Sequence, residues 1–75
     1  SESLIDVVTS ISGSGPAYIF YLVEVLTEIG ISEGLEEEDA KVLALETLIG
    51  SAKLLDMTNI DPKVLRKNVR ISIRQ

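Results

Sequence analysis

A short stretch rich in glycine and serine, Ser12-Gly13-Ser14-Gly15-Pro16, has the residue types and spacing best suited to chemistry. Proline fits the first turn of a helix, because the N–H that it lacks would have no intrahelical partner there. Ser14 or Gly15 is then the expected N-cap, and the glycines let another molecule approach the backbone closely. Such a helix start presents free N–H groups and a positive dipole end, which suit an anionic or planar group. The plainer alternative is a cap that only begins a helix.

Four consecutive acidic residues, Glu36-Glu37-Glu38-Asp39, are the second feature that suggests chemistry. One interpretation is a site for a divalent metal. The other is the first turn of a helix, where acidic side chains are favoured by the helix dipole. Consecutive residues point in different directions around a helix and converge poorly on one ion. The sequence therefore predicts a helix start here and no metal site.

Composition limits the class of protein. With 75 residues, of which 45% are hydrophobic and only 4% aromatic, the chain is one small domain with an aliphatic core, which favours helices. It contains no cysteine and no histidine, so it has no disulfide, no thiolate metal site and no histidine base. A net charge of −5 argues against a nucleic-acid partner. The longest nearly apolar run is too short to cross a membrane and contains Glu24, so we expect a cytoplasmic chain without a membrane partner.

The apolar pattern places the helices. Residues 4–11 predict a short helix capped by Ser1 or Ser3, although their β-branched side chains leave a strand possible. A second helix is expected over 16–32 and should end at Gly30 or Gly34. The acidic run opens a third helix over 37–55.

The C-terminal part of the sequence contains a strong helix start. Asp61 is a good N-cap and Pro62 fits the first helical position, so a short helix is expected over 62–68. The tail, residues 70–75, alternates polar and apolar residues and is compatible with a strand, a frayed end or a helix extension.

Both long helices are apolar on nearly all sides, and a chain of this length cannot cover them both. The sequence thus predicts an all-α fold, a small bundle of two long antiparallel-type helices plus short helices, completed by a homodimer partner or by a larger parent protein. Gly50 lies inside the 37–55 helix, where glycine costs about 1 kcal/mol relative to alanine. Its expected role is to allow another helix to approach closely.

Several of these residues also resemble a known family, the pyrroline-5-carboxylate reductases. The resemblance covers residues 3–69 and rests on Ile11-Ser12-Gly13-Ser14-Gly15-Pro16-Ala17-Tyr18, Gly30, Gly34-Leu35, Ala40, Gly50-Ser51-Ala52-Lys53-Leu54-Leu55, Pro62, Leu65, Arg66, Asn68 and Val69. It implies that residues 1–69 are the C-terminal helical domain of such an enzyme, which forms an interlocked dimer in the family. Family members reduce 1-pyrroline-5-carboxylate to proline, the last step of proline synthesis, with a hydride from NADPH or NADH.

The resemblance also implies a set of site residues. Gly13, Ser14, Gly15 and Pro16 would line the site beside the nicotinamide and the substrate, and Asn68 would lie at its edge. None of them is expected to be catalytic. The rest of the site would come from an N-terminal Rossmann domain, and the active oligomer would be a homodimer or larger.

The sequence departs from the family in two respects. It has no Gly-x-Gly-x-x-Gly fingerprint, so no cofactor is expected to bind to this chain alone. After Val69 the family has a Ser/Thr-Ser-Pro-Gly-Gly-Thr-Thr loop that holds the substrate carboxylate, whereas here residues 70–75 form a divergent tail. We therefore expect a reductase fragment that is inactive in isolation. The alternatives are a catalytically silent helical interaction module, and an anion-binding module built on the helix start at Ser12–Pro16.

Overall fold

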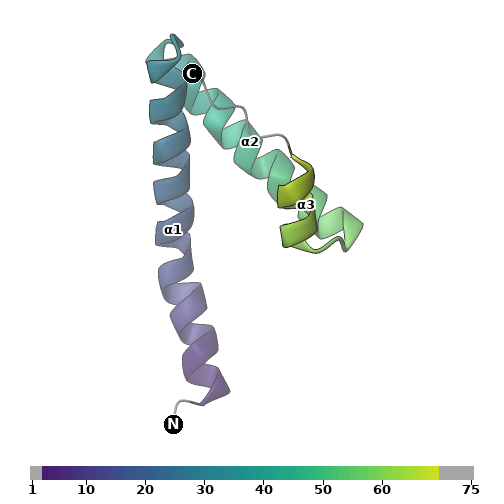
Figure 1. Ribbon diagram of the computed structural model, residues 1–75. Coiled ribbons are helices and arrows are strands. Elements are labelled where there is room, and N and C mark those ends of the chain that lie inside the picture. Colours follow the sequence, from purple (N-terminus) through teal and green to yellow (C-terminus); the bar gives the residue numbers. More distant parts are fainter. Residues whose placement is uncertain (1–2, 70–75) are drawn as a thin grey trace.

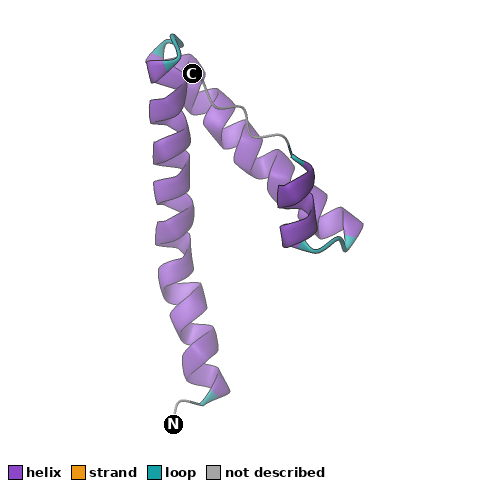
Figure 2. Cartoon of the chain, viewed as in Figure 1, coloured by secondary structure: helices purple, strands orange, loops and turns teal. Residues whose placement is uncertain are grey.

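Three helices make up the computed structural model, which describes residues 3–69. They are α1 (Leu4–Ser32), α2 (Glu37–Thr58) and α3 (Pro62–Asn68), and this part of the chain contains no strand (Figures 1 and 2). The all-α prediction is confirmed. The alternatives for residues 70–75, and Ser1 as a cap, concern positions outside the described residues.

The first helix is continuous, and this corrects the predicted break before Pro16. A single helix runs from Leu4 to Ser32 with Pro16 in its interior (Figure 1). Its N-cap is Ser3, whose hydroxyl oxygen accepts a hydrogen bond from the N–H of Asp6 at 3.2 Å. Ser14 and Gly15 are therefore not caps, and the free N–H groups expected there are absent from that segment.

Local chemistry explains why the helix passes through the proline. The ring of a proline clashes with the Cβ and the N–H of the residue before it, which disfavours the helical region for that residue. Gly15 has no Cβ, so the larger part of this clash is absent. The hydroxyls of Ser12 and Ser14 donate to the carbonyls of Thr9 and Ser10, at 3.3 and 2.6 Å, which is how serine side chains bond inside a helix.

The end of α1 follows the predicted glycine signal. Gly34 adopts a left-handed conformation with φ of +109°. The N–H of Leu35 donates to the carbonyl of Gly30, and that of Gly34 to the carbonyl of Ile31, both at 3.0 Å. This pair of bonds is the Schellman motif, which satisfies the last carbonyls of a helix and turns the chain away.

The second and third helices begin as expected. The first turn of α2 holds the acidic residues, and the Lys41 ammonium lies 3.5 and 3.8 Å from the carboxylates of Glu37 and Glu38. This helix ends at Thr58, about one turn later than predicted. The Asp61 carboxylate caps α3 by accepting a hydrogen bond from the N–H of Lys63 at 2.7 Å.

The two long helices cross beside the turn that joins them. Ala40 and Ala44, one turn apart on α2, are the buried residues of the described chain. A Cβ placed on Gly30 of α1 would lie 3.1 Å from the Cβ of Ala40, so the backbones approach closely there. By contrast, a Cβ on Gly50 would meet nothing within 4 Å. The close crossing within this chain is therefore at Gly30, and no described helix of the same chain lies against Gly50.

The chain reverses direction after α1, and the helices then diverge into an open V (Figure 1). The Cα radius of gyration is 15.4 Å, whereas a compact chain of this length would have about 11 Å. The fold thus leaves most of its apolar residues without cover from the same chain, as the sequence predicted.

Candidate functional site

The segment Gly13–Pro16 lies inside α1, on the arm of the V that extends away from α2. A Cβ added to Gly13 or Gly15 would meet nothing within 4 Å, so the backbone surface there is bare. The Ser14 hydroxyl donates its proton to the Ser10 carbonyl. Another molecule can therefore approach the backbone here, but the serine hydroxyl is already engaged as a donor.

The chemistry of this segment differs from the one predicted. A helix interior offers no free N–H groups, because each N–H donates to a carbonyl four residues earlier. Pro16, however, has no N–H to give to the carbonyl of Ser12. In this segment, therefore, the carbonyl oxygen of Ser12 lacks its usual N–H donor, and it lies beside two glycines, Gly13 and Gly15. This arrangement suits a flat group that carries a hydrogen-bond donor better than it suits an anion.

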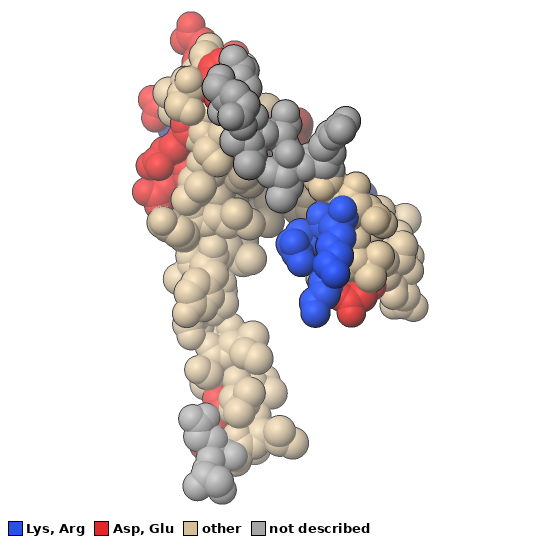
Figure 3. All heavy atoms as spheres, viewed as in Figure 1, with Lys and Arg blue, Asp and Glu red and all other residues tan. Residues whose placement is uncertain are grey.

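Asn68 is the remaining residue that the resemblance implicated. It is the last residue of α3 and is exposed. Figure 3 shows open space between the N-terminal half of α1 and the end of the molecule that bears α3. α3, which ends at Asn68, therefore lies apart from the N-terminal half of α1, which contains Gly13–Pro16 (Figures 1 and 3).

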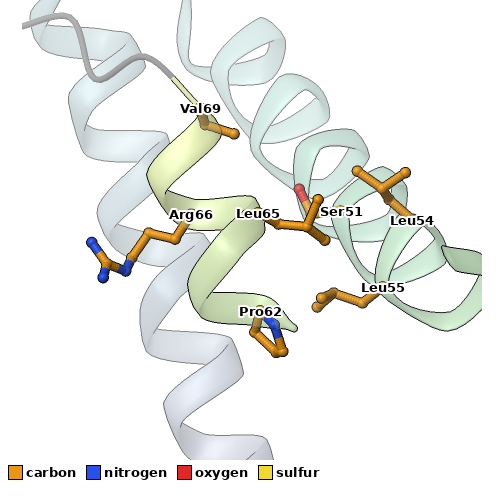
Figure 4. A pocket seen from close by; sticks show the side chains of 7 residues that line it. All are labelled: Ser51, Leu54, Leu55, Pro62, Leu65, Arg66 and Val69. Atoms are coloured by element: carbon orange, nitrogen blue, oxygen red, sulfur yellow. The ribbon is translucent and has the colours of Figure 1, made fainter. Parts of the chain in front are cut away.

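A groove between α2 and α3 was not found by sequence reasoning. This α2–α3 groove has a volume of about 220 Å³ and is lined by Ser51, Leu54, Leu55, Pro62, Leu65, Arg66 and Val69. In the close-up, Leu65 points from α3 toward Ser51 of α2, whereas the Arg66 side chain extends away from the apolar residues (Figure 4). The interior of the groove is thus apolar. In the sequence, the signs of this groove were Leu54 and Leu55 on α2 and the i, i+4 pair Leu65 and Val69 on α3.

A second hollow lies between α1 and α2, near their crossing. This α1–α2 hollow is lined by Phe20, Val23, Glu24, Thr27, Glu28, Ile31, Glu37, Lys41 and Leu45. Its rim is acidic, in keeping with the acidic side chains seen along this part of the surface in Figure 3. Within residues 3–69, no three acidic side chains are grouped so that they could hold a metal ion. None of the described helices is long and apolar enough to cross a membrane.

Comparison with known proteins gives a consistent picture. Residues 2–72 match the family model for pyrroline-5-carboxylate reductase dimerisation. The chain is 44% identical over 68 residues to a pyrroline-5-carboxylate reductase of Arabidopsis thaliana, covering 91% of this chain and 25% of that protein. It is 52% identical over 54 residues to the corresponding enzyme of Mycobacterium leprae, covering 72% of this chain and 18% of the relative.

A solved structure agrees with these sequence matches. The chain resembles the crystal structure of Plasmodium falciparum pyrroline carboxylate reductase with NADP bound, with a TM-score of 0.78 and 34% identity. The match covers 91% of this chain and 27% of that one. The chain thus spans about a quarter of the length of the relatives it matches.

Proposed function

The chain belongs to the pyrroline-5-carboxylate reductase dimerisation family, and on this premise we propose that it joins two copies of itself through its uncovered helix faces. We propose further that it supplies one wall of the site at which a reductase of this family works. The two proposals are separable, because the first concerns assembly and the second concerns chemistry.

The observation that carries the first proposal is the size of the accessible surface. The chain exposes 6726 Å², whereas a compact monomer of 8.2 kDa would expose about 4,500 Å². The excess of roughly 2,200 Å² is comparable to what each subunit buries in a large obligate dimer interface. Much of it is apolar, and large exposed apolar surfaces are characteristic of protein interfaces.

The second proposal follows from the relatives. They are pyrroline-5-carboxylate reductases, and the similar solved structure holds NADP. We propose that the protein carrying this chain transfers a hydride from NADPH or NADH to 1-pyrroline-5-carboxylate, giving proline, with a Rossmann domain to hold the cofactor. Gly13, Ser14, Gly15 and Pro16 would then form the bare backbone surface against which the substrate or the nicotinamide lies. A cytoplasmic location stays a prediction.

The position of Asn68 bears on how such a site is assembled. Because α3 lies apart from the N-terminal half of α1 in one chain, Asn68 can border Gly13–Pro16 only if another copy or a rearrangement brings it there (Figure 3). A site shared between two copies accounts for both the separation and the uncovered apolar surface. Assembly and chemistry would then depend on each other in the complete protein.

One observation favours a second candidate, an interaction module without chemistry. The Ser14 hydroxyl is bonded to Ser10, so the Gly13–Pro16 segment offers no free acid or base. The two candidates differ in whether the segment binds small molecules. The test is to titrate a dimeric reductase that contains this chain with NADPH and with proline, and to follow the amide chemical shifts of Gly13 and Gly15. Shift changes confined to the Gly13–Pro16 segment support the site. Unchanged shifts support the silent module.

The assembly proposal is tested by sedimentation equilibrium of the 75-residue chain over a range of concentrations. The expected species has twice the 8.2 kDa mass of one chain. A chain that stays monomeric at high concentration, with its helices intact by circular dichroism, contradicts the proposal.

A further inference from the structure

The N-terminal segment of α1, residues 4–13, has no support from the rest of the described chain. Every residue in it is exposed, whereas Val23, Leu26 and Thr27 further along the same helix are half-buried. The segment extends away from α2 and α3 (Figure 1). An isolated helix shorter than roughly 12–15 residues is only marginally stable in water. The helical state of this segment therefore depends on its connection to the rest of α1.

That connection is the weakest part of the helix. It consists of Gly13, Ser14, Gly15 and Pro16, and glycine and proline are the two poorest helix formers. Pro16 has no N–H to donate, so one hydrogen bond of the helix is missing at this point. A Cβ added to Gly13 or Gly15 would meet nothing within 4 Å, so no packing within the described chain supports the connection. A break in α1 therefore costs least here.

The same residues contain a second helix start. The observed start is capped by Ser3, whose hydroxyl oxygen accepts a hydrogen bond from the N–H of Asp6, three residues later. Ser14 is an equally good N-cap type, and Pro16 fits the first turn that would follow it. In that arrangement the Ser14 hydroxyl would accept from the N–H of Ala17, again three residues later. α1 thus carries two complete start signals, of which the structure uses the first.

We propose that α1 is a two-state helix. In the long state, which the structure shows, the helix begins at Leu4 and the Ser14 hydroxyl donates to the Ser10 carbonyl at 2.6 Å. In the short state, Ser14 is the N-cap and residues 4–13 leave the helix. The two states exclude each other, because an N-cap residue has non-helical backbone angles. Anything that covers the N-terminal segment as a helix binds the long state alone and shifts the equilibrium toward it.

The two states present different hydrogen-bonding groups at Gly13–Pro16. In the long state the Ser12 carbonyl is an acceptor without an N–H partner, and the Gly15 N–H is bonded to the Ile11 carbonyl. In the short state the Gly15 N–H lies in the first turn of a helix and becomes a free donor. This consequence rests on the proposed function only where a ligand is concerned: at the proposed site, the equilibrium decides whether the segment accepts or donates.

Hydrogen exchange of the folded 75-residue chain, measured at one fixed concentration by NMR, tests the two states. The amides of residues 8–13 should exchange at least about tenfold faster than those of residues 20–30, because they open without unfolding of the whole chain. The change in protection should fall as a step at Gly13–Pro16, where the short helix begins. Fraying from the N-terminus alone would give a smooth gradient.

Replacing the two capping serines should move the protection of residues 8–13 in opposite directions. Ser3→Ala removes the cap of the long state and should lower this protection about fivefold. Ser14→Ala removes the cap of the short state and should raise it. The matched control is Ser12→Ala, because Ser12 also donates its hydroxyl proton to a carbonyl one turn earlier but caps neither state. Ser14→Ala should therefore exceed Ser12→Ala by about fivefold.

A further variant keeps the short-state cap. Ser14→Asp supplies a carboxylate that caps as well as the hydroxyl does, so the protection of residues 8–13 should stay at or below that of the natural chain. A step at Gly13–Pro16, raised by Ser14→Ala beyond Ser12→Ala and not by Ser14→Asp, establishes the two states. A smooth gradient, equal effects of Ser14→Ala and Ser12→Ala, or a segment as well protected as residues 20–30 overturns them. None of these results depends on reductase activity, so the proposed function stands or falls separately.

Discussion

A Cβ atom placed on Gly30 of α1 would lie 3.1 Å from the Cβ of Ala40 on α2, which is closer than most such contacts in proteins. The crossing of the two long helices therefore depends on the absence of a side chain at Gly30. Ala40 is 1% exposed, so it has little room to move aside. The two residues together set the distance between the helices at the apex of the V.

Replacing Gly30 tests this contact. Alanine is favoured over glycine in a helix by about 1 kcal/mol, so Gly50→Ala, with open space around it, should stabilise the chain by that amount. Gly30→Ala should gain clearly less, and Gly30→Leu should cost about 1–3 kcal/mol through overpacking. Urea unfolding followed by circular dichroism at one fixed chain concentration measures all three. Equal effects of alanine at the two glycines would show that the crossing is not tight.

A larger side chain at Gly50 is expected to act on assembly instead. Nothing in the described chain lies within 4 Å of a Cβ at this position, so Gly50→Leu should leave the helices of one chain intact. If a partner helix approaches there, the same substitution weakens the dimer by overpacking its interface. Sedimentation measures the change in dimer Kd. An unchanged dimer Kd would show that Gly50 does not lie in the interface.

Local sequence signals predicted the end of α1 and the start of α3 correctly. Gly34 ends α1 through its left-handed conformation, and Asp61 with Pro62 opens α3. Each of these signals acts through hydrogen bonds a few residues apart, so the sequence contains the whole cause.

The prediction of a helix break before Pro16 was wrong because proline is compatible with two positions in a helix. It fits the first turn of a helix, and it can also lie inside one at the cost of a hydrogen bond. Which of these occurs depends on the energy of the surrounding helix, and here Gly15 relieves the clash before the ring. The α2–α3 groove was not predictable either, because it depends on how Leu65 packs toward Ser51 across two helices (Figure 4).

Two serine substitutions distinguish the observed helix from the predicted one. Ser3→Ala removes the observed N-cap and should cost about 1 kcal/mol. Ser14→Ala lies in the helix interior, where alanine is the better helix former, so it should be neutral or slightly stabilising. Thermal unfolding of the two variants at equal concentration gives the comparison. If Ser14→Ala destabilised the chain as much as Ser3→Ala does, Ser14 would be acting as a helix cap.

Removing the proline should separate stability from function. Pro16→Ala supplies the N–H that the Ser12 carbonyl lacks. It also removes a proline, which costs up to about 3 kcal/mol relative to alanine in a helix interior. We expect a more stable α1 and, in a reductase that contains this chain, a lower kcat because the bare backbone acceptor is lost. Unfolding and steady-state kinetics on the same preparations measure both effects. A variant that is more stable and fully active would show that the Gly13–Pro16 segment is not part of the proposed site.

The 75-residue chain assayed on its own should show no reductase turnover. Hydride transfer requires a nicotinamide and an imine held in a fixed orientation, and such positioning supplies on the order of 7–11 kcal/mol of a barrier. The sequence has no Gly-x-Gly-x-x-Gly turn to bind the pyrophosphate of the cofactor, and residues 3–69 form helices without a strand to carry one. The measurement is the change in NADPH absorbance with 1-pyrroline-5-carboxylate at high chain concentration, against a buffer blank. Turnover above the blank that disappears in Pro16→Ala would mean that these helices alone orient a dinucleotide, and the proposed division of labour with a Rossmann domain would be wrong.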